Sequence, residues 1–302
     1  MASPTLAPPP PPASWRRRLQ AALYGHRAAQ LLLLLLPPAG WFGVVYLGSL
    51  AILFVAAFWY LDPLTSAVRH DLTLRNFEQI LAVPVYRTIV LRTVGVATLV
   101  TLLDVVLAFP VAYLMARVAA PRTRALLFAA VLLPLWTSYL VRVFAWRTII
   151  SKGGPVDWLL AQVGLPGASL YNTEIAMVIV FTYLWLPYMI LPIYAGLERI
   201  PASLLEASAD LGARHAATFR RVVLPLALPA VAAGSIFTFS LTLGDYITPQ
   251  LISNSQFIGN VVYDSQGVAG NVPFAAAFAT VPVLIMGIYL LGMRRLGAFE
   301  AL

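Results

Sequence analysis

Two aspartates are the first residues of chemical interest, because their carboxylates lie in or beside apolar stretches. Asp104 falls near the centre of the stretch 93–115, and Asp245 follows the stretch 222–243. If these apolar stretches cross a membrane, an ionised carboxylate at the centre of one costs roughly 3 kcal/mol or more unless it meets water or a partner. Asp104 could therefore attract a cation in a pathway, or form a hydrogen bond between packed helices. Asp245 could meet an incoming ammonium group, or be a solvated residue at a helix end.

Several aromatic side chains lie near the same stretches, and their ring faces attract ammonium groups. The candidates to line a pathway are Trp136, Tyr139, Trp146 and Tyr183. Such residues more often pack between helices or form the interfacial belt of a membrane protein. Arg142 lies close to the end of the apolar stretch 125–146. Its long side chain predicts an interfacial anchor that reaches the membrane surface.

Catalytic and metal-binding groups are scarce. The sequence has no cysteine and three histidines, and its single lysine, Lys152, stands between Ser151 and Gly153. A phosphate-binding loop of the Gly-Lys-Ser/Thr type is therefore excluded, and the sequence Gly-x-Ser-x-Gly does not occur either. We expect no catalytic residue, no metal site and no cofactor bound by this chain. If ATP drives the protein, a different chain hydrolyses it.

The composition identifies the class of protein. Apolar residues make up 60% of the 302 residues, charged residues only 11%, and the mean hydropathy is +0.83. A soluble domain with these values would expose large apolar patches. The apolar stretches are about 20 residues long, which favours membrane helices over a β-barrel. The net charge of +8 is typical of basic cytoplasmic loops, so we expect the lipid bilayer and not nucleic acid as a partner.

Six stretches are long enough to cross a membrane, so we predict an all-α integral membrane protein with six transmembrane helices. They are 39–60, 93–115, 125–146, 174–196, 222–243 and 273–293. Pro37 and Pro38 should divide the first apolar region into an interfacial turn and a span. With the N-terminus inside, thirteen of the twenty basic residues lie in cytoplasmic segments. This bias predicts that both termini are cytoplasmic.

The sequence divides into a short N-terminal tail and a membrane domain. Residues 1–30 hold a proline run and four arginines, which predicts a disordered, basic cytoplasmic tail. Residues 31–302 should form the six-helix membrane domain. Its longest cytoplasmic connection, 197–221, has helical signals of its own.

The residue pattern of the connection 197–221 predicts two short helices. Ser203 with Glu206 three residues later resembles a capping box, and Gly212 can adopt the left-handed conformation that ends a helix. Asp210 should lie on an exposed face. Four apolar residues would form a cytoplasmic surface suited to a protein partner, namely Leu204, Leu205, Leu211 and Phe219. A hairpin that lies on the membrane interface would explain the same pattern.

A resemblance to a known family favours a surface for a protein partner over a hairpin on the membrane interface. The series Glu-Ala-x-x-x-x-Gly, followed at fixed spacing by an aliphatic residue, Leu and Pro, resembles the signature of ABC importer permeases. The matching residues here are Glu206, Ala207, Gly212, Val222, Leu224 and Pro225. Ser208 departs from the alanine that is more common in the family. The resemblance implies the type I ABC importer architecture and a coupling helix that docks on an ATPase through Glu206, Ala207, Asp210, Gly212, Phe219 and Pro225.

The resemblance extends over residues 72–291 and is nearest to the spermidine/putrescine-type branch. The segments 133–142, 186–192 and 243–249 carry it. It implies import of polyamines, with Asp104, Trp136, Tyr139, Tyr183 and Asp245 as candidate path residues. A phosphonate, an amino-acid derivative, ferric ion or sulfate remains an alternative solute. A secondary transporter is the alternative of another class, and it would need paired inverted repeats, which we do not find.

The resemblance also implies the partners. They are a cytoplasmic ATPase dimer that binds ATP and magnesium, a second permease subunit in a heterodimer, and an extracytoplasmic solute-binding protein. The protein would be a multi-pass subunit of a bacterial inner membrane.

Overall fold

The computed structural model describes residues 27–164 and 170–298, and these form two compact units divided between Val55 and Ala56. The regular structure of the described chain is helical except for a short antiparallel hairpin of β1 (Tyr60–Leu61) and β2 (Val68–Arg69). Most of the predicted tail, residues 1–26, lies outside the described residues, and its last four residues are helical.

The first unit is one apolar helix that changes its winding. It consists of α2 (Arg27–Trp41), the π-helix η1 (Phe42–Leu47) and α3 (Gly48–Ala56), whose last residue belongs to the second unit. The predicted break at Pro37 and Pro38 is wrong, because α2 runs through both prolines. Each proline removes one N–H donor from the helix, and local changes of helix type accommodate this loss in membrane helices. The segment Gln30–Ala56 is therefore a single candidate span.

Four further long apolar helices belong to the second unit, so five described helices could each cross a membrane. They are α5 (Pro84–Tyr113), extended by η2 (Leu114–Val118), α9 (Glu174–Glu198), α12 (Leu224–Gly244) with the turns before it, and α15 (Val272–Arg294). The prediction of spans at these places is confirmed. The short helix α4 (Arg75–Ala82) precedes α5.

The helices α5, α9 and α12 pack against one another and form the centre of the second unit. At Gly196 of α9, an added Cβ would lie 2.3 Å from the Cβ of Ala230 in α12. At Gly234 of α12, an added Cβ would lie 3.3 Å from the Cα of Met189. The missing side chains therefore allow α9 and α12 to approach closely, as small residues do in membrane helix pairs.

The predicted span 125–146 is not one helix. It consists of α6 (Pro121–Leu132) and the 3-10 turn η3 (Leu133–Trp136), followed after a bend of 95° by α7 (Tyr139–Ile150), which continues towards α8 (Pro155–Gln162). Pro134 lies in the turn, and the backbone of Thr137 and Ser138 is extended. The number of spans is six only if this bent pair counts as one.

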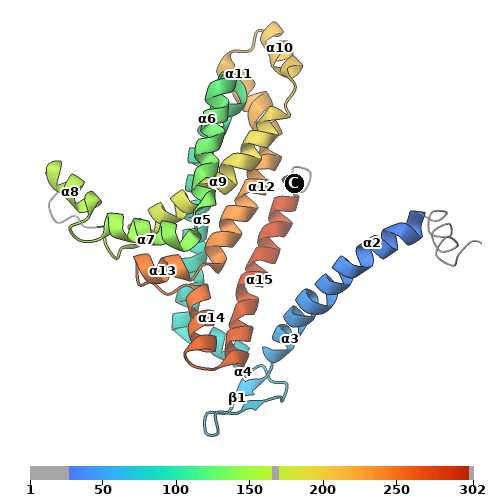
Figure 1. Ribbon diagram of the computed structural model, residues 1–302, viewed down its shortest axis with the longest axis vertical. Coiled ribbons are helices and arrows are strands. Elements are labelled where there is room, and N and C mark those ends of the chain that lie inside the picture. The colour runs from blue at the N-terminus through green and yellow to red at the C-terminus, as the bar shows by residue number, and fades with distance from the viewer. Residues whose placement is uncertain (1–26, 165–169, 299–302) are drawn as a thin grey trace, which may run out of the picture. The chain divides into compact units, whose positions relative to one another are not determined.

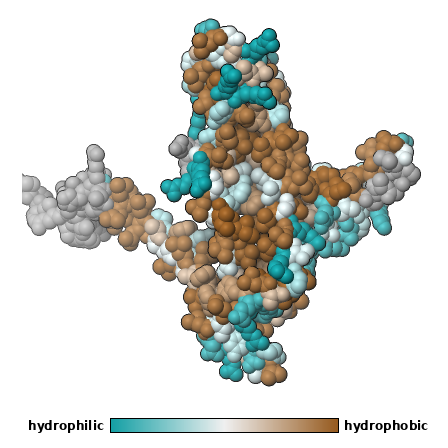
Figure 2. Space-filling model, turned by 180° about the vertical axis from the view of Figure 1, so that it is seen from behind, coloured by the Kyte–Doolittle hydropathy of each residue, from teal (hydrophilic) through white to brown (hydrophobic). Residues whose placement is uncertain are grey.

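The remaining elements lie at the two ends of the second unit or across it. At one end are α10 (Ala202–Asp210), α11 (His215–Thr218) and the π-helix η4 (Phe219–Val223), while α14 (Ile258–Gly267) lies at the other end (Figure 1). The helices α7 and α13 (Ile247–Ile252) run across the bundle (Figure 1). Hydrophobic residues dominate the middle of this unit, and hydrophilic residues gather mainly at its ends (Figure 2). This distribution fits a bilayer around the middle.

Candidate functional site

The connection 197–221 is held to the bundle by Arg117, at the end of the α5 and η2 helix. The Arg117 guanidinium donates hydrogen bonds to the backbone carbonyls of Leu197 and Ile200, the latter at 2.6 Å. These carbonyls lie at the C-terminus of α9, where an arginine satisfies acceptors that the helix leaves free. The sequence analysis counted this arginine only among the thirteen basic residues of the cytoplasmic segments, and no local pattern indicated this contact.

A second contact supports the same helix end. Arg124 of α6 forms an ion pair with Glu198 at 3.4 Å, and the hydroxyl of Tyr194 donates to the same carboxylate at 3.2 Å. Both members of the ion pair are about half exposed or less. An exposed pair of this kind contributes only about 0–1 kcal/mol, so it adds little to the stability of the helix end.

The helix α10 begins differently from the prediction. Its N-cap is Pro201, which has no side-chain oxygen, and Ser203 lies inside the helix, so the capping box is wrong. The predicted end is confirmed, because Gly212 has a φ of +76°. The N–H groups of Gly212 and Ala213 donate to the carbonyls of Ala209 and Ser208 at 2.8 and 3.1 Å. Such bonds stop a helix cleanly and turn the chain towards α11.

The four apolar residues of the connection divide into two pairs. Phe219 packs edge-on against Phe109 and Tyr113, at 5.6 and 6.0 Å between ring centroids, and Leu205 packs against the same core cluster. Leu204 and Leu211 are 44% and 89% exposed. The apolar surface is therefore smaller than predicted, and Phe219 anchors the connection to α5.

The exposed residues of α10 and its turn form what we call the loop surface. It consists of Ala202, Ser203, Leu204, Glu206, Ala207, Ala209, Asp210, Leu211 and Gly212. Ser208 forms a hydrogen bond of 2.9 Å with Thr218 and so ties α10 to α11. Pro225 is exposed at the start of α12 and is not part of this surface.

An open groove lies at the base of the loop surface, between the end of α9 and the start of α12. It has a volume of about 270 Å³. Its lining residues are Gly196, Arg199, Ile200, Pro201, Leu204, Leu226, Pro229 and Ala230. The groove therefore brings Leu204 of α10 beside Gly196 and Ala230, which form the close contact between α9 and α12.

Asp245 and Tyr139, which the sequence analysis selected separately, lie together. The Tyr139 hydroxyl donates to one carboxylate oxygen of Asp245, and the Thr248 hydroxyl donates to the same oxygen at 2.9 Å. The other oxygen accepts the N–H of Ile247 at 2.8 Å. Burial raises the pKa of the Asp245 carboxyl, and the hydrogen bonds from Tyr139 and Thr248 oppose this change. Asp245 is only 9% exposed, so the alternative of a solvated helix-end residue is wrong.

Three of the four aromatic candidates make ring contacts, in two separate pairs. Tyr139 stacks on Trp185 with 5.8 Å between ring centroids, and Trp146 contacts Tyr183 at 5.3 Å. Trp136 is 81% exposed on η3. The sequence analysis missed Trp185 and Thr248. A hydroxyl residue three positions after Asp245, at a helix start, was an available signal for Thr248.

Asp104 is fully buried on α5. Neither of its carboxylate oxygens has a hydrogen-bond partner within residues 27–164 and 170–298. It lies one turn from Val100 and one turn from Ala108, which belong to two different core clusters. In this arrangement no solute can reach Asp104, and both the pathway role and the packing role remain predictions.

Arg142 is buried among the described residues and does not extend from the surface of the helices. Its side chain is 8% exposed, and its Nε and Nη1 atoms lack hydrogen-bond partners in the described part of the chain. The interpretation as an interfacial anchor is therefore wrong. The reason is the 95° bend before α7, which turns Arg142 away from the end of a straight span.

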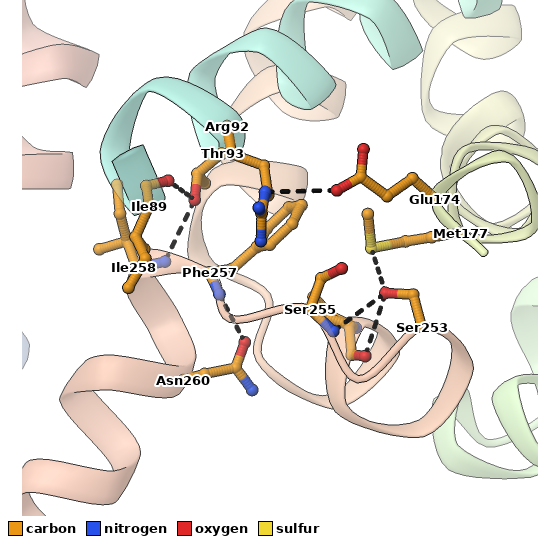
Figure 3. A network of polar contacts seen from close by, with 11 residues as sticks. Ile89, Arg92, Thr93, Glu174, Met177, Ser253, Ser255, Phe257, Ile258 and Asn260 are labelled. Carbon is orange, nitrogen blue, oxygen red and sulfur yellow. Dashed lines mark hydrogen bonds and ion pairs between the residues drawn. The ribbon is translucent and has the colours of Figure 1, made fainter. Parts of the chain in front are cut away.

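A polar network holds the turn between α13 and α14 against the ends of α5 and α9 (Figure 3). Arg92 pairs with Glu174 at 3.3 Å, and Thr93 accepts the N–H of Ile258 at 3.2 Å. Ser253 donates to the Met177 sulfur at 3.2 Å. These contacts fix the elements beside Asp245 at the end of the bundle opposite α10.

Comparisons with known proteins agree on one family. Residues 108–296 match the family described as "Binding-protein-dependent transport system inner membrane component". The chain is 48% identical to the inner membrane ABC transporter permease protein YdcU of Escherichia coli, over 88% of this chain and 89% of YdcU. It is 30% identical to the spermidine/putrescine transport system permease protein PotB of Escherichia coli, over 83% and 92%. A chain of the bacterial alginate ABC transporter has the same fold, with a TM-score of 0.75, 17% identity and coverage of 94% and 98%.

Proposed function

The chain belongs to the binding-protein-dependent inner-membrane components, the permeases of ABC importers, and from this premise we propose that it moves polyamines such as spermidine and putrescine into the cytoplasm. As a permease it is a non-catalytic transmembrane subunit. The similarity to PotB supports the solute, and the cluster around Asp245 is the observation that carries the proposal.

The chemistry of that cluster suits an amine. Asp245 offers a carboxylate, and the stacked rings of Tyr139 and Trp185 lie beside it. Carboxylates and aromatic faces both attract ammonium groups. Because the hydrogen bonds to Asp245 come from two different elements, α7 and α13, a solute that competes for this carboxylate would also loosen the contact between them.

The loop surface is the part that we propose to dock on the ATPase. Glu206, Ala207 and Asp210 are exposed on α10, and Gly212 sets the turn that presents them. ATP and magnesium would bind to the ATPase dimer. A displacement of α10 would reach α9 at Leu197 and Ile200, and Arg117 would pass it to α5. Phe219 and Pro225 would act at the start of α12, behind the docking surface.

The other partners and the orientation follow from this assignment. We propose that the α10 end and both termini are cytoplasmic, and that the end with α14 and the β1–β2 hairpin meets the solute-binding protein. A second, different permease subunit would complete the channel. Two arrangements of the spans, open to one side or the other, would then be biased by the ATPase.

Uptake into vesicles tests the solute. The complete complex, with its ATPase, second permease and binding protein, is reconstituted and supplied with radiolabelled putrescine or spermidine. We expect ATP-dependent uptake, and Asp245→Asn should slow it several-fold while the complex still assembles. Absence of polyamine uptake by the wild-type complex would remove this solute. Uptake that continues without the ATPase would instead favour a secondary transporter.

A further inference from the structure

The groove between the end of α9 and the start of α12 combines an apolar lining with one positive charge. Its volume is about 270 Å³, and residues of α9, α10 and α12 contribute to it. Leu204 and Leu226 of the lining are 44% and 47% exposed, so the groove is open to the surroundings of the protein. Ligand pockets in proteins usually begin at about 300 Å³. A groove of this size therefore suits a slender chain better than a bulky molecule.

Among the described lining residues, only Arg199 is charged. It is exposed, and the ion pairs within the described chain involve other arginines, namely Arg69, Arg92 and Arg124. Glu198, its neighbour in the sequence, pairs with Arg124 at 3.4 Å, and the first turn of α10 contains no acidic residue. Arg199 therefore offers its charge to an anion from outside this chain.

The groove lies where a span meets a hydrophilic end of the molecule. The candidate span of α9 ends at Glu198, one residue before Arg199, and hydrophilic residues gather mainly at the ends of the unit (Figure 2). At the start of α12, within the candidate span His215–Gly244, three leucines are 38–47% exposed, namely Leu224, Leu226 and Leu228. Exposed leucines within a span suit contact with acyl chains, and an arginine at its end reaches the layer of headgroups.

We propose that this groove binds an anionic phospholipid, with an acyl chain along Leu226 and Pro229 and the phosphate at Arg199. A guanidinium binds phosphate oxygens through two parallel hydrogen bonds. Basic pockets between membrane helices bind anionic headgroups in the same way. A lipid in this place would contact α9, α10 and α12 together, at the base of the loop surface. Lipid binding here is independent of the transported solute.

A phospholipid matches the groove better than two other occupants. A free phosphate would satisfy Arg199 but would leave the apolar lining exposed. A helix of the second permease is about 10–12 Å across, so it could place only single side chains in a groove of this volume. Such a helix would also bury the charge of Arg199 unless it supplied a carboxylate.

Native mass spectrometry of the complete complex in detergent tests the charge, because it counts bound lipids. Dioleoyl phosphatidylglycerol is titrated beside dioleoyl phosphatidylcholine, which has the same acyl chains and no net charge. Arg199→Gln should weaken binding of one phosphatidylglycerol about fivefold, since one arginine near the headgroups contributes about this factor, and should weaken phosphatidylcholine less. Arg199→Lys should retain part of the affinity. Arg122→Gln, at an exposed arginine of α6, is the matched control and should bind as wild type.

A second pair of variants tests the groove without changing a charge. In Leu226→Trp the indole would fill the groove, so binding of both lipids should weaken. Leu228→Trp changes an exposed leucine of α12 that does not line the groove, and it should leave both affinities unchanged.

Four results would overturn the lipid site. Equal binding of phosphatidylglycerol by Arg199→Gln and Arg122→Gln would remove the role of Arg199, and normal binding by Leu226→Trp would remove the groove. Displacement of the lipid by inorganic phosphate, but not by chloride at the same ionic strength, would assign Arg199 to a free anion. Loss of the second permease on co-purification of Leu226→Trp, but not of Leu228→Trp, would assign the groove to a contact between subunits.

Discussion

Arg117 shows how one side chain can join a cytoplasmic connection to the membrane helices. Its guanidinium bonds to two backbone carbonyls at the end of α9, and its own helix is continuous with α5. Because the acceptors are backbone carbonyls, these bonds hold the main chain at the end of α9 in place. The bond therefore fixes the position from which α10 departs.

We predict that Arg117→Met uncouples the transporter without preventing its assembly. The carbonyls of Leu197 and Ile200 would lose a charged donor, which typically contributes about 1.5–3 kcal/mol per bond. Solute-stimulated ATP hydrolysis should fall several-fold, and Arg117→Lys should restore part of it. Arg122→Met, at an exposed arginine nearby, is the control and should behave as wild type. Equal hydrolysis in Arg117→Met and Arg122→Met would contradict the role of Arg117.

The residue scale is also where the sequence was least informative. Asp245 and Tyr139 could be selected because acidic and aromatic residues beside apolar stretches are conspicuous. The hydrogen bond between them could not be predicted, because it joins residues 106 positions apart in the sequence. Arg142 was misinterpreted because its expected depth assumed a straight helix through residues 125–146.

At the scale of elements, hydropathy located the long helices because burial in lipid depends on composition. It did not locate the break near Pro134, since apolar residues continue on both sides of it. Three π-helical segments also lie within a few residues of prolines: η1 after Pro38, η2 after Pro110 and η4 before Pro225. The prolines therefore lie near changes of helix type, and those inside α2 and α5 do not end the spans.

The contact between α9 and α12 gives a prediction at this scale. Gly196→Ala places a Cβ 2.3 Å from that of Ala230, which forces the helices apart. Overpacking of this kind typically costs about 1–3 kcal/mol. We expect a lower midpoint of thermal unfolding for the detergent-solubilised complex. Gly95→Ala, where no atom lies within 4 Å of the added Cβ, serves as the control. An unchanged midpoint for Gly196→Ala would contradict the prediction that close packing of α9 against α12 stabilises the protein.

The turn after α10 gives a second prediction. Gly212 has a positive φ that a β-branched residue adopts only with strain, so Gly212→Val should displace the loop surface. The chain should still insert, because the spans are unchanged, but solute-stimulated ATP hydrolysis should be lost. Gly267→Val, at a glycine of α14 with no atom within 4 Å of an added Cβ, is the comparison at the opposite end. Normal stimulation in Gly212→Val would contradict the importance of this turn.

For the whole molecule, the account requires that the ends of the bundle face different compartments. The sequence contains no cysteine, so single cysteines can be introduced one at a time. Gln256→Cys should react in spheroplasts with a thiol reagent that cannot cross membranes, because Gln256 is exposed at the α14 end. Ala207→Cys should be protected until the membrane is opened. The reverse pattern would invert the orientation.

The central claim is that α10 touches the ATPase, and crosslinking tests it most directly. Ala207→Cys in the assembled complex is treated with a short thiol-to-amine crosslinker, with Gln256→Cys treated in parallel. The account predicts a covalent product between the permease and the ATPase from Ala207→Cys, whose yield changes when ATP is added, and none from Gln256→Cys. An ATPase product from Gln256→Cys and none from Ala207→Cys would contradict it.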